Sequence, residues 1–316
     1  MGAYVSRRLL GVVPTLLAVM FIVVFMTRLI PGSVVDVLLS DQPAGNTKVD
    51  RQVIEHRLGL DEPFYVQFTK YIVNVAQGDL GQSLWTQQSV SETIFKRAPV
   101  SLELAGLSLV VSIVVAIGIG IISAVRQGSV LDYALRSGAV VALSVPSFAI
   151  ATLVIVMPAI WFQWTPPLFY KSFSEDPSGH WLLLLTPALI LGLGSAGLMR
   201  LTRTAMLEVL RQDYIRTARA KGLNGHVVIL RHGLKNALLP VVTLLGLQVS
   251  VALSGSVIME QMFNIPGLGR LLVEALSVRD YPTIQGLTLI TALLVILVNL
   301  AVDISYVLLD PRIKVS

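Results

Sequence analysis

Few side chains in this sequence have the type and spacing that covalent chemistry requires. None of the four histidines, His56, His180, His226 and His232, pairs with another at the spacing of a zinc protease motif. The chain also lacks a phosphate-binding G-x-x-x-x-G-K-[ST] loop, a G-x-S-x-G nucleophile motif and any cysteine. The histidines are expected to be solvated or structural. Neither ATP hydrolysis by this chain alone nor a cofactor or metal site is predicted.

Positive charge is the more informative feature, because eight Lys and Arg residues fall between Arg200 and Lys235. A basic loop of this kind can dock on another protein or rest on anionic lipid headgroups. In a soluble protein, a formal net charge of +5 would suggest a nucleic-acid partner. The composition argues against solubility and against nucleic acid, since 54% of residues are hydrophobic and only 14% charged.

Charge-free runs predict an all-α membrane protein with about six transmembrane helices. A helix needs about 20 apolar residues to cross the hydrocarbon, and a charge at its centre is costly. The six runs are Leu9–Thr27, Leu104–Val125, Ser137–Tyr170, Trp181–Met199, Asn236–Met259 and Tyr281–Val302. The third run is too long for one crossing and too short for two, so one span from about Ser137 to Ile160 and an interfacial loop are predicted. The first run is too long for a signal core, and a retained helix is favoured over a signal peptide.

The Lys and Arg distribution predicts the orientation of these spans. With the N-terminus inside, the cytoplasmic segments carry most of the basic residues, including the eight between Arg200 and Lys235. The short outer loops carry only Lys171 and the pair Arg270 and Arg279. By the positive-inside rule, both termini are expected in the cytoplasm.

The predicted organisation has one membrane domain. Residues 1–30 form a tail and span one, 31–101 an extracytoplasmic segment, 102–309 the remaining spans, and 310–316 a cytoplasmic tail. The cytoplasmic loop lies at 200–235. Helix-forming patches at Asp50–Leu58 and Pro63–Val75 predict a small helical cap in the extracytoplasmic segment.

Small and polar residues inside the spans mark helix contacts or the wall of a path. Prolines within spans permit kinks, because each removes a backbone hydrogen bond. For the polar residues, structural packing and a role in transport or coupling both stay open. The residues concerned are Ser112, Ala116, Gly120 and Ala124 in span two; Gly246, Ser250 and Ser254 in span five; Asn299 and Asp303 in span six; and prolines Pro14, Pro146 and Pro187.

The loop sequence from Asp213 to Pro240 predicts two short helices with a break. Asp213–Lys221 is rich in helix formers, with an acid at its start and basic residues at its end, as the helix dipole favours. Gly222 suits a C-terminal cap that needs positive φ, and Asn224 can cap the next helix. A helix this short is marginal in water and needs a surface, which a cytoplasmic partner could supply.

Several motifs resemble those of the inner-membrane permeases of binding-protein-dependent ABC importers, in the dipeptide, oligopeptide, nickel and glutathione subfamily. The resemblance covers essentially the whole chain. It rests on YVSRRLLGVVPTLL at the start, LGLDEP at 58–63, GDLGQS at 78–83, RTARAKG at 216–222 with RHGLKNALLP at 231–240, FNIPGLGRLL from Phe263, and RDYP at 279–282. Arg216, Thr217 and Ala218 stand where the family's EAA loop has Glu-Ala-Ala, with Gly222 as its glycine. Only the alanine and the glycine agree with the general form, and the rest follows the peptide-type version.

The resemblance implies a type I ABC importer permease fold in the cytoplasmic membrane of a bacterium or archaeon. It implies a second, homologous permease as heterodimer partner, two ATP-binding subunits and an extracytoplasmic substrate-binding protein. Di- or oligopeptides are the first choice of substrate, with nickel chelates, glutathione and oligosaccharides as alternatives. Contact with an ATPase is expected at Asp213, Tyr214, Arg216, Thr217, Ala218, Lys221 and Gly222. The PGLG turn, at Pro266, Gly267 and Gly269, is expected to approach the binding protein or to serve only as a turn.

Two rival classes fit the sequence less well. A membrane-embedded enzyme needs an intramembrane catalytic pair, and none is visible. An ion-driven secondary transporter normally shows buried acids and inverted repeats, whereas Asp303 stands alone and no repeat is apparent.

Overall fold

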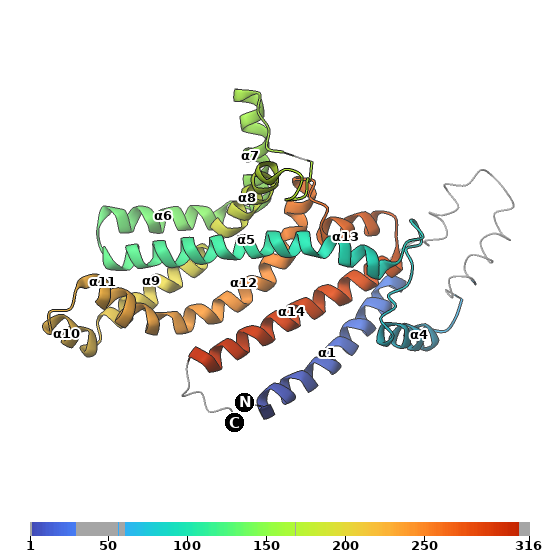
Figure 1. Ribbon diagram of the computed structural model, residues 1–316, viewed down its shortest axis with the longest axis horizontal. Coiled ribbons are helices and arrows are strands. Elements are labelled where there is room, and N and C mark those ends of the chain that lie inside the picture. Colours follow the sequence, from blue (N-terminus) through green and yellow to red (C-terminus); the bar gives the residue numbers. More distant parts are fainter. Residues whose placement is uncertain (1, 30–55, 57–60, 168, 310–316) are drawn as a thin grey trace. The chain divides into compact units, whose positions relative to one another are not determined.

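The computed structural model describes residues 2–29, 56, 61–167 and 169–309, and this part of the chain is almost entirely helical (Figure 1). Its one β pairing is an isolated antiparallel bridge between Gln82 and Ser89. The helices are α1 (Gly2–Leu29), α4 (Phe64–Ala76), α5 (Val90–Val125), α6 (Val130–Ser144), α7 (Ser147–Phe162), α8 (Pro177–Leu193), α9 (Ala196–Leu210), α10 (Asp213–Ala220), α11 (Gly225–Val227), the π-helix η1 (Val228–Leu234), α12 (Lys235–Met262), α13 (Leu268–Ser277) and α14 (Tyr281–Leu309).

Apolar helices occur where the charge-free runs predict spans. Three described stretches are long and apolar enough to cross a membrane singly, namely α5, Gly225–Val249 and Tyr281–Ala301. Two bent pairs, α6 with α7 and α8 with α9, also qualify if each counts as one span, which gives up to five. A shorter apolar stretch, Leu10–Met26, lies within α1. The predicted all-α membrane fold is confirmed.

The third run is not the single straight span that the sequence predicted. It consists of α6 and α7, which meet at an angle of 94°. Proline disfavours helical backbone in the residue before it, and Val145 accordingly adopts an extended conformation with φ −98° and ψ 121° just before Pro146. Pro146 therefore ends one helix and starts another. Pro187 lies inside α8 without a break there, and the 52° bend follows at Gly194 and Ser195.

One of the two helical patches predicted in the segment at 31–101 is a helix among the described residues. Pro63 is the N-cap of α4, in agreement with the second predicted patch. The first patch, Asp50–Leu58, lies outside the described residues except for His56. Span two also starts earlier than the charge-free run, because α5 begins at Val90 and carries its charged first turns before the apolar stretch.

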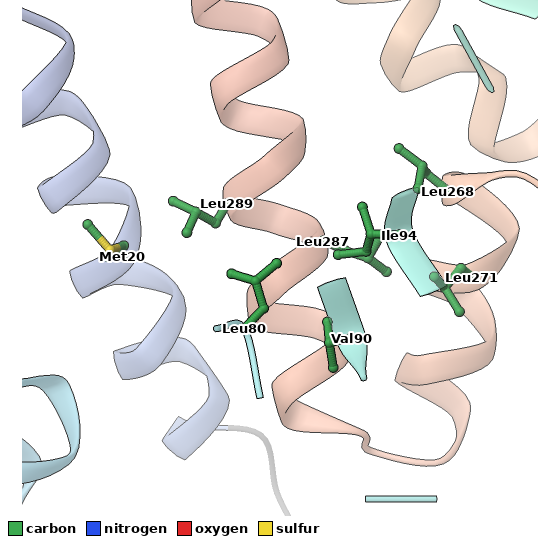
Figure 2. Close-up of a cluster of buried hydrophobic side chains, with 8 residues drawn as sticks. All are labelled: Met20, Leu80, Val90, Ile94, Leu268, Leu271, Leu287 and Leu289. Atoms are coloured by element: carbon green, nitrogen blue, oxygen red, sulfur yellow. The ribbon is translucent and has the colours of Figure 1, made fainter. Parts of the chain in front are cut away.

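The described residues fall into two compact units. The described residues of 1–100 and 266–296 form one unit, and those of 101–265 and 297–316 form the other. The core of the first unit gathers apolar side chains from α1, α5, α13, α14 and the segment before α5 (Figure 2). These are Met20, Leu80, Val90, Ile94, Leu268, Leu271, Leu287 and Leu289.

Two of the sequence motifs meet in this first unit. The carboxylate of Asp280, which is 4% exposed, accepts hydrogen bonds from the Ser83 hydroxyl at 2.6 Å and from the Leu84 N–H at 3.0 Å. Ser83 ends the GDLGQS motif at Gly78–Ser83, and Asp280 belongs to the RDYP motif at Arg279–Pro282. A buried carboxylate needs such partners, so the two motifs fix the entry into α5 against the start of α14.

The second unit is organised around the small-residue stripe of α5. Ser112 bonds Ser195 at 2.6 Å between their hydroxyl oxygens, and its hydroxyl lies 3.4 Å from the carbonyl oxygen of Gly192. A Cβ on Gly120 would lie 2.7 Å from the Cβ of Thr202 in α9. Small side chains therefore let α5 approach the bent pair α8 and α9 closely. The stripe marks a helix contact, and its members are Ser112, Ala116, Gly120 and Ala124.

Candidate coupling site

The helix α10 lies between α9 and α11 in the basic loop (Figure 1). Its C-terminal end follows the predicted pattern, because Gly222 has φ +77°. The N–H of Gly222 bonds the carbonyl of Arg219 at 2.9 Å, and the N–H of Leu223 bonds that of Ala218 at 3.4 Å. This is a Schellman motif, which satisfies carbonyls that the helix end leaves unpaired. The Asn224 side chain then caps the following helix by accepting from the N–H of His226, as predicted.

The surface on which the inner face of α10 rests belongs to the chain itself. Ile215 is fully buried and Ala218 is 7% exposed, and both pack with Val228 of η1 in one apolar cluster, which Leu210 borders. Ala218 is therefore part of the support of α10 and not of its outer surface.

The opposite face of α10 is open and polar. Tyr214, Thr217, Lys221 and Gly222 are exposed. The side chains of Arg216 and Asp213 are 76% and 96% exposed, and they face each other at 3.5 Å. An ion pair this exposed adds little stability. The helix thus presents a ridge of mixed charge on a rigid apolar base, which is suited to insertion into a complementary cleft.

The loop does not contain two separate short helices, because the second one continues into span five. Gly225 to Met262 is helical without interruption through α11, η1 and α12. The amide of Asn236 donates to the Tyr214 hydroxyl at 2.8 Å and so ties α10 to α12. A Cβ on Gly233 would lie 3.5 Å from the side chains of Leu210 and Met206 of α9. The RHGLKN motif thus supplies residues that hold α9, α10 and α12 together.

The residues predicted to line a path or to pack between helices differ in their burial. Gly246 is buried in α12, whereas Asn299 is exposed on α14. Ser250, Ser254 and Asp303 lie in helices, but their side chains are outside the described part of the structure. A role of these residues in a path stays a prediction.

The PGLG turn is mostly buried in its own chain. Gly267 and Gly269 are buried and Pro266 is partly buried. Leu268 and Leu271 from the same segment enter the core of the first unit. The segment therefore has a packing role within the chain, and contact of these residues with a binding protein stays a prediction.

Sequence reasoning missed a buried ion pair beside the loop. Arg203 of α9 donates from Nε and Nη2 to the two carboxylate oxygens of Asp132 in α6, at 2.9 and 2.8 Å. The Ser123 hydroxyl and the Gly128 N–H donate to the same carboxylate. The partners are 71 positions apart, so spacing alone could not pair them. One local signal existed, because Ser129 and Asp132 form the S-x-x-D pattern of a helix start, and Ser129 does cap α6.

His180 illustrates the structural role expected for the histidines. It is 2% exposed, with Nε2 at 2.8 Å from a carboxylate oxygen of Glu103 and Nδ1 at 3.0 Å from the carbonyl oxygen of Lys171. The first contact joins α8 to α5, and the second joins the loop before α8 to α8 itself.

Two family models match the chain and together cover nearly all of it. The model for the binding-protein-dependent transport system inner membrane component matches residues 116–315. The model for the N-terminal part of such membrane components matches residues 1–105. The chain belongs to this family of inner-membrane transport components. The permease is therefore a transport subunit and not an enzyme, and the two rival classes are set aside.

Relatives are similar to the permease over nearly its full length. It is 39% identical to the di/tripeptide transport system permease protein DppB of Pseudomonas aeruginosa, over 99% of both chains. It is 40% identical to the glutathione transport system permease protein GsiC of Salmonella paratyphi A, over 98% of both chains. A putative peptide transport system permease protein of Brucella abortus is 39% identical over 99% of both chains.

Solved structures agree with the fold of the permease. The MetNI methionine ABC transporter, in inward-facing conformations, matches with a TM-score of 0.51 at 16% identity, covering 69% of this chain and 96% of that one. An amino acid ABC transporter matches with a TM-score of 0.50 at 15% identity, covering 71% and 95%. At this identity the likeness concerns the fold, which is that of ABC importer permeases.

Proposed function

We propose that this permease moves di- or oligopeptides across the cytoplasmic membrane, as one of two membrane subunits of an ATP-driven importer. The observation that carries the proposal is the full-length similarity to permeases named for peptide transport, at 39% identity over 99% of both chains. Glutathione is the second candidate, because the glutathione permease of Salmonella is equally similar.

The outer face of α10 is the proposed contact with an ATP-binding subunit. Its support comes from the buried pair Ile215 and Ala218, and the exposed residues Arg216 and Thr217 project away from that support. Closure of an ATPase dimer would move α10 as a rigid body, and α12 would follow. ATP binding then favours one of two global states, which is alternating access driven by differential affinity.

The remaining partners and the orientation belong to the same proposal. The distribution of Lys and Arg supports cytoplasmic termini and a cytoplasmic α10. A second homologous permease would complete the path, and a soluble binding protein would deliver the substrate at the opposite face. The segment around α4 lies on that face in this orientation.

Uptake competition tests the substrate. Proteoliposomes that contain the complete importer and its binding protein would take up a labelled dipeptide, and unlabelled tripeptide, glutathione or maltose would be added in excess. Competition by peptides alone is expected. Competition by glutathione alone would replace the peptide assignment with the second candidate, and competition by maltose alone would overturn both.

Cross-linking tests the contact at α10. The chain contains no cysteine, so Thr217→Cys creates one reactive thiol on the exposed face of the helix. A thiol-to-amine cross-linker is expected to join it to an ATPase subunit in inverted membrane vesicles. Ser174→Cys, in the predicted outer loop before α8, is the matched control and should give no such product. A cross-link from Ser174→Cys in place of Thr217→Cys would refute both the contact and the orientation.

A further inference from the structure

A groove with a volume of about 590 Å³ lies between α6 and α9 in the second unit. Its α6 wall consists of Tyr133, Arg136, Ser137, Val140 and Val141. These positions repeat at three- and four-residue spacing and therefore share one face of the helix. The α9 wall is formed by Arg200, Arg203 and Thr204, which share a face by the same spacing. The groove plays no part in the coupling contact proposed at α10.

The groove carries two positive charges that no acidic side chain of the described residues neutralises. Arg203 is paired through two nitrogens with the buried Asp132, and this ion pair is neutral as a whole. Arg136 and Arg200 are exposed, and neither has an ion-pair partner among the described residues. The guanidinium of Arg136 instead lies 5.8 Å from the ring centre of Tyr133. Two free guanidiniums beside hydroxyl groups favour a phosphate ligand, because guanidinium matches phosphate geometry.

An apolar wall continues from the charged end of the groove. Val140 and Val141 are 52% and 62% exposed, although they lie in a helix of the membrane-spanning type. They follow Arg136 by four and five residues, which corresponds to about 6 to 7.5 Å along the helix axis. The groove therefore offers a cationic zone and, one turn further, an aliphatic zone.

We propose that this groove binds an anionic phospholipid, with its phosphate between Arg136 and Arg200 and an acyl chain along Val140 and Val141. This ligand class fits because a phospholipid carries an anionic phosphate next to an aliphatic chain, in the same order as the cationic and the apolar zone of the groove. A free phosphate would satisfy the cationic zone and leave the valines unused. A helix of the second permease would cover the valines but would need an acidic residue for each arginine. Basic pockets between membrane helices are a recurrent type of site for such headgroups.

Native mass spectrometry of the detergent-solubilised importer complex tests the proposal by titration with phosphatidylglycerol, cardiolipin or phosphatidylcholine. The variants are Arg136→Gln, Arg200→Gln and the pair. Arg126→Gln, an exposed arginine outside the groove, is the matched control. Each groove substitution is expected to weaken the binding of the anionic lipids about fivefold, and the pair about 25-fold, if each charge contributes independently. The control should retain wild-type binding, and Arg136→Lys with Arg200→Lys should restore most of the affinity.

Three results would overturn the assignment. Equal binding of phosphatidylglycerol to the wild type and the double variant would show that the two arginines do not bind the lipid. Displacement of the bound lipid by inorganic phosphate at comparable concentration would identify a simple anion site. Efficient cross-linking of a single Ser137→Cys to the second permease would show that a protein covers the groove. Unchanged thermal melting of the double variant would verify that loss of lipid is not loss of fold.

Discussion

Replacing Gly222 by valine perturbs the turn that holds α10 without touching any neighbouring side chain. Gly222 has φ +77°, and a Cβ placed there would meet nothing within 4 Å. The cost is therefore conformational and not steric. An L-residue in the left-handed region costs about 1 to 2 kcal/mol, and a β-branched residue lies at the upper end of that range.

That cost is comparable in size to the free energy that holds α10 in place. The main apolar anchor is Ile215, whose full burial contributes about 1.5 to 3 kcal/mol. A penalty of about 2 kcal/mol would lower the population of docked α10 relative to undocked α10 by about 30-fold. Uptake should fall while ATP hydrolysis continues without control by the loaded binding protein. Gly222→Asn is the matched variant, because asparagine tolerates positive φ, and it should retain most of the coupling.

The assay measures ATP hydrolysis and substrate uptake in the same proteoliposomes, together with hydrogen exchange over residues 213–223. Faster exchange and uncoupled hydrolysis are expected for Gly222→Val. If exchange in α10 stays at the wild-type rate, the estimate of strain is wrong. If exchange rises but coupling is normal, α10 is not the coupling element.

Three further tests concern the packing of α10, the buried carboxylate of Asp280 in the first unit, and the approach of α5 to α9 in the second unit. Ile215→Ala should destabilise α10 by about 2 to 5 kcal/mol and uncouple ATP hydrolysis from transport. Arg216 is exposed, so Arg216→Ala should leave hydrogen exchange in α10 unchanged and weaken only the capture of ATPase subunits in a pull-down assay. Asp280→Asn should lower the free energy of unfolding by about 1 to 3 kcal/mol, because an amide cannot accept all the hydrogen bonds of that carboxylate. The melting temperature in detergent should fall accordingly. An unchanged melting temperature would contradict this. Gly120→Ala should lower the melting temperature, because the added methyl group crowds α9 at a cost of about 1 to 3 kcal/mol. Gly118→Ala in the same helix should not, because there is open space at its Cβ. Equal effects of the two substitutions would refute the close approach of α5 to α9.

Local features of this protein could be predicted well from its sequence. Charge-free runs located the apolar helices, because exclusion of charge from hydrocarbon acts on each segment separately. The turn at Gly222 and the cap at Asn224 also follow from single residues and their immediate neighbours. The helix α4 was located from Pro63 and the pattern that follows it.

Features that depend on distant partners could not be predicted in this way. The burial of Ile215 and Ala218 required knowledge that Val228 folds back onto them. The bonds of Asp280 with Ser83 join positions 197 apart, and no periodic pattern relates them. The angle of 94° at Pro146 was missed for another reason, since a proline predicts that a helix is interrupted but not how the two halves are oriented.

The unbroken helix from Gly225 to Met262 has a mechanical consequence. It is about 55 Å long along its axis at about 1.5 Å per residue, and α10 is attached near one end through Asn236 and Val228. If the helix moved as one body, a rotation of about 5° about that end would displace the other end by up to roughly 5 Å. A modest push on α10 is then amplified with distance, so a short helix held by two buried side chains can act as the input arm of a lever.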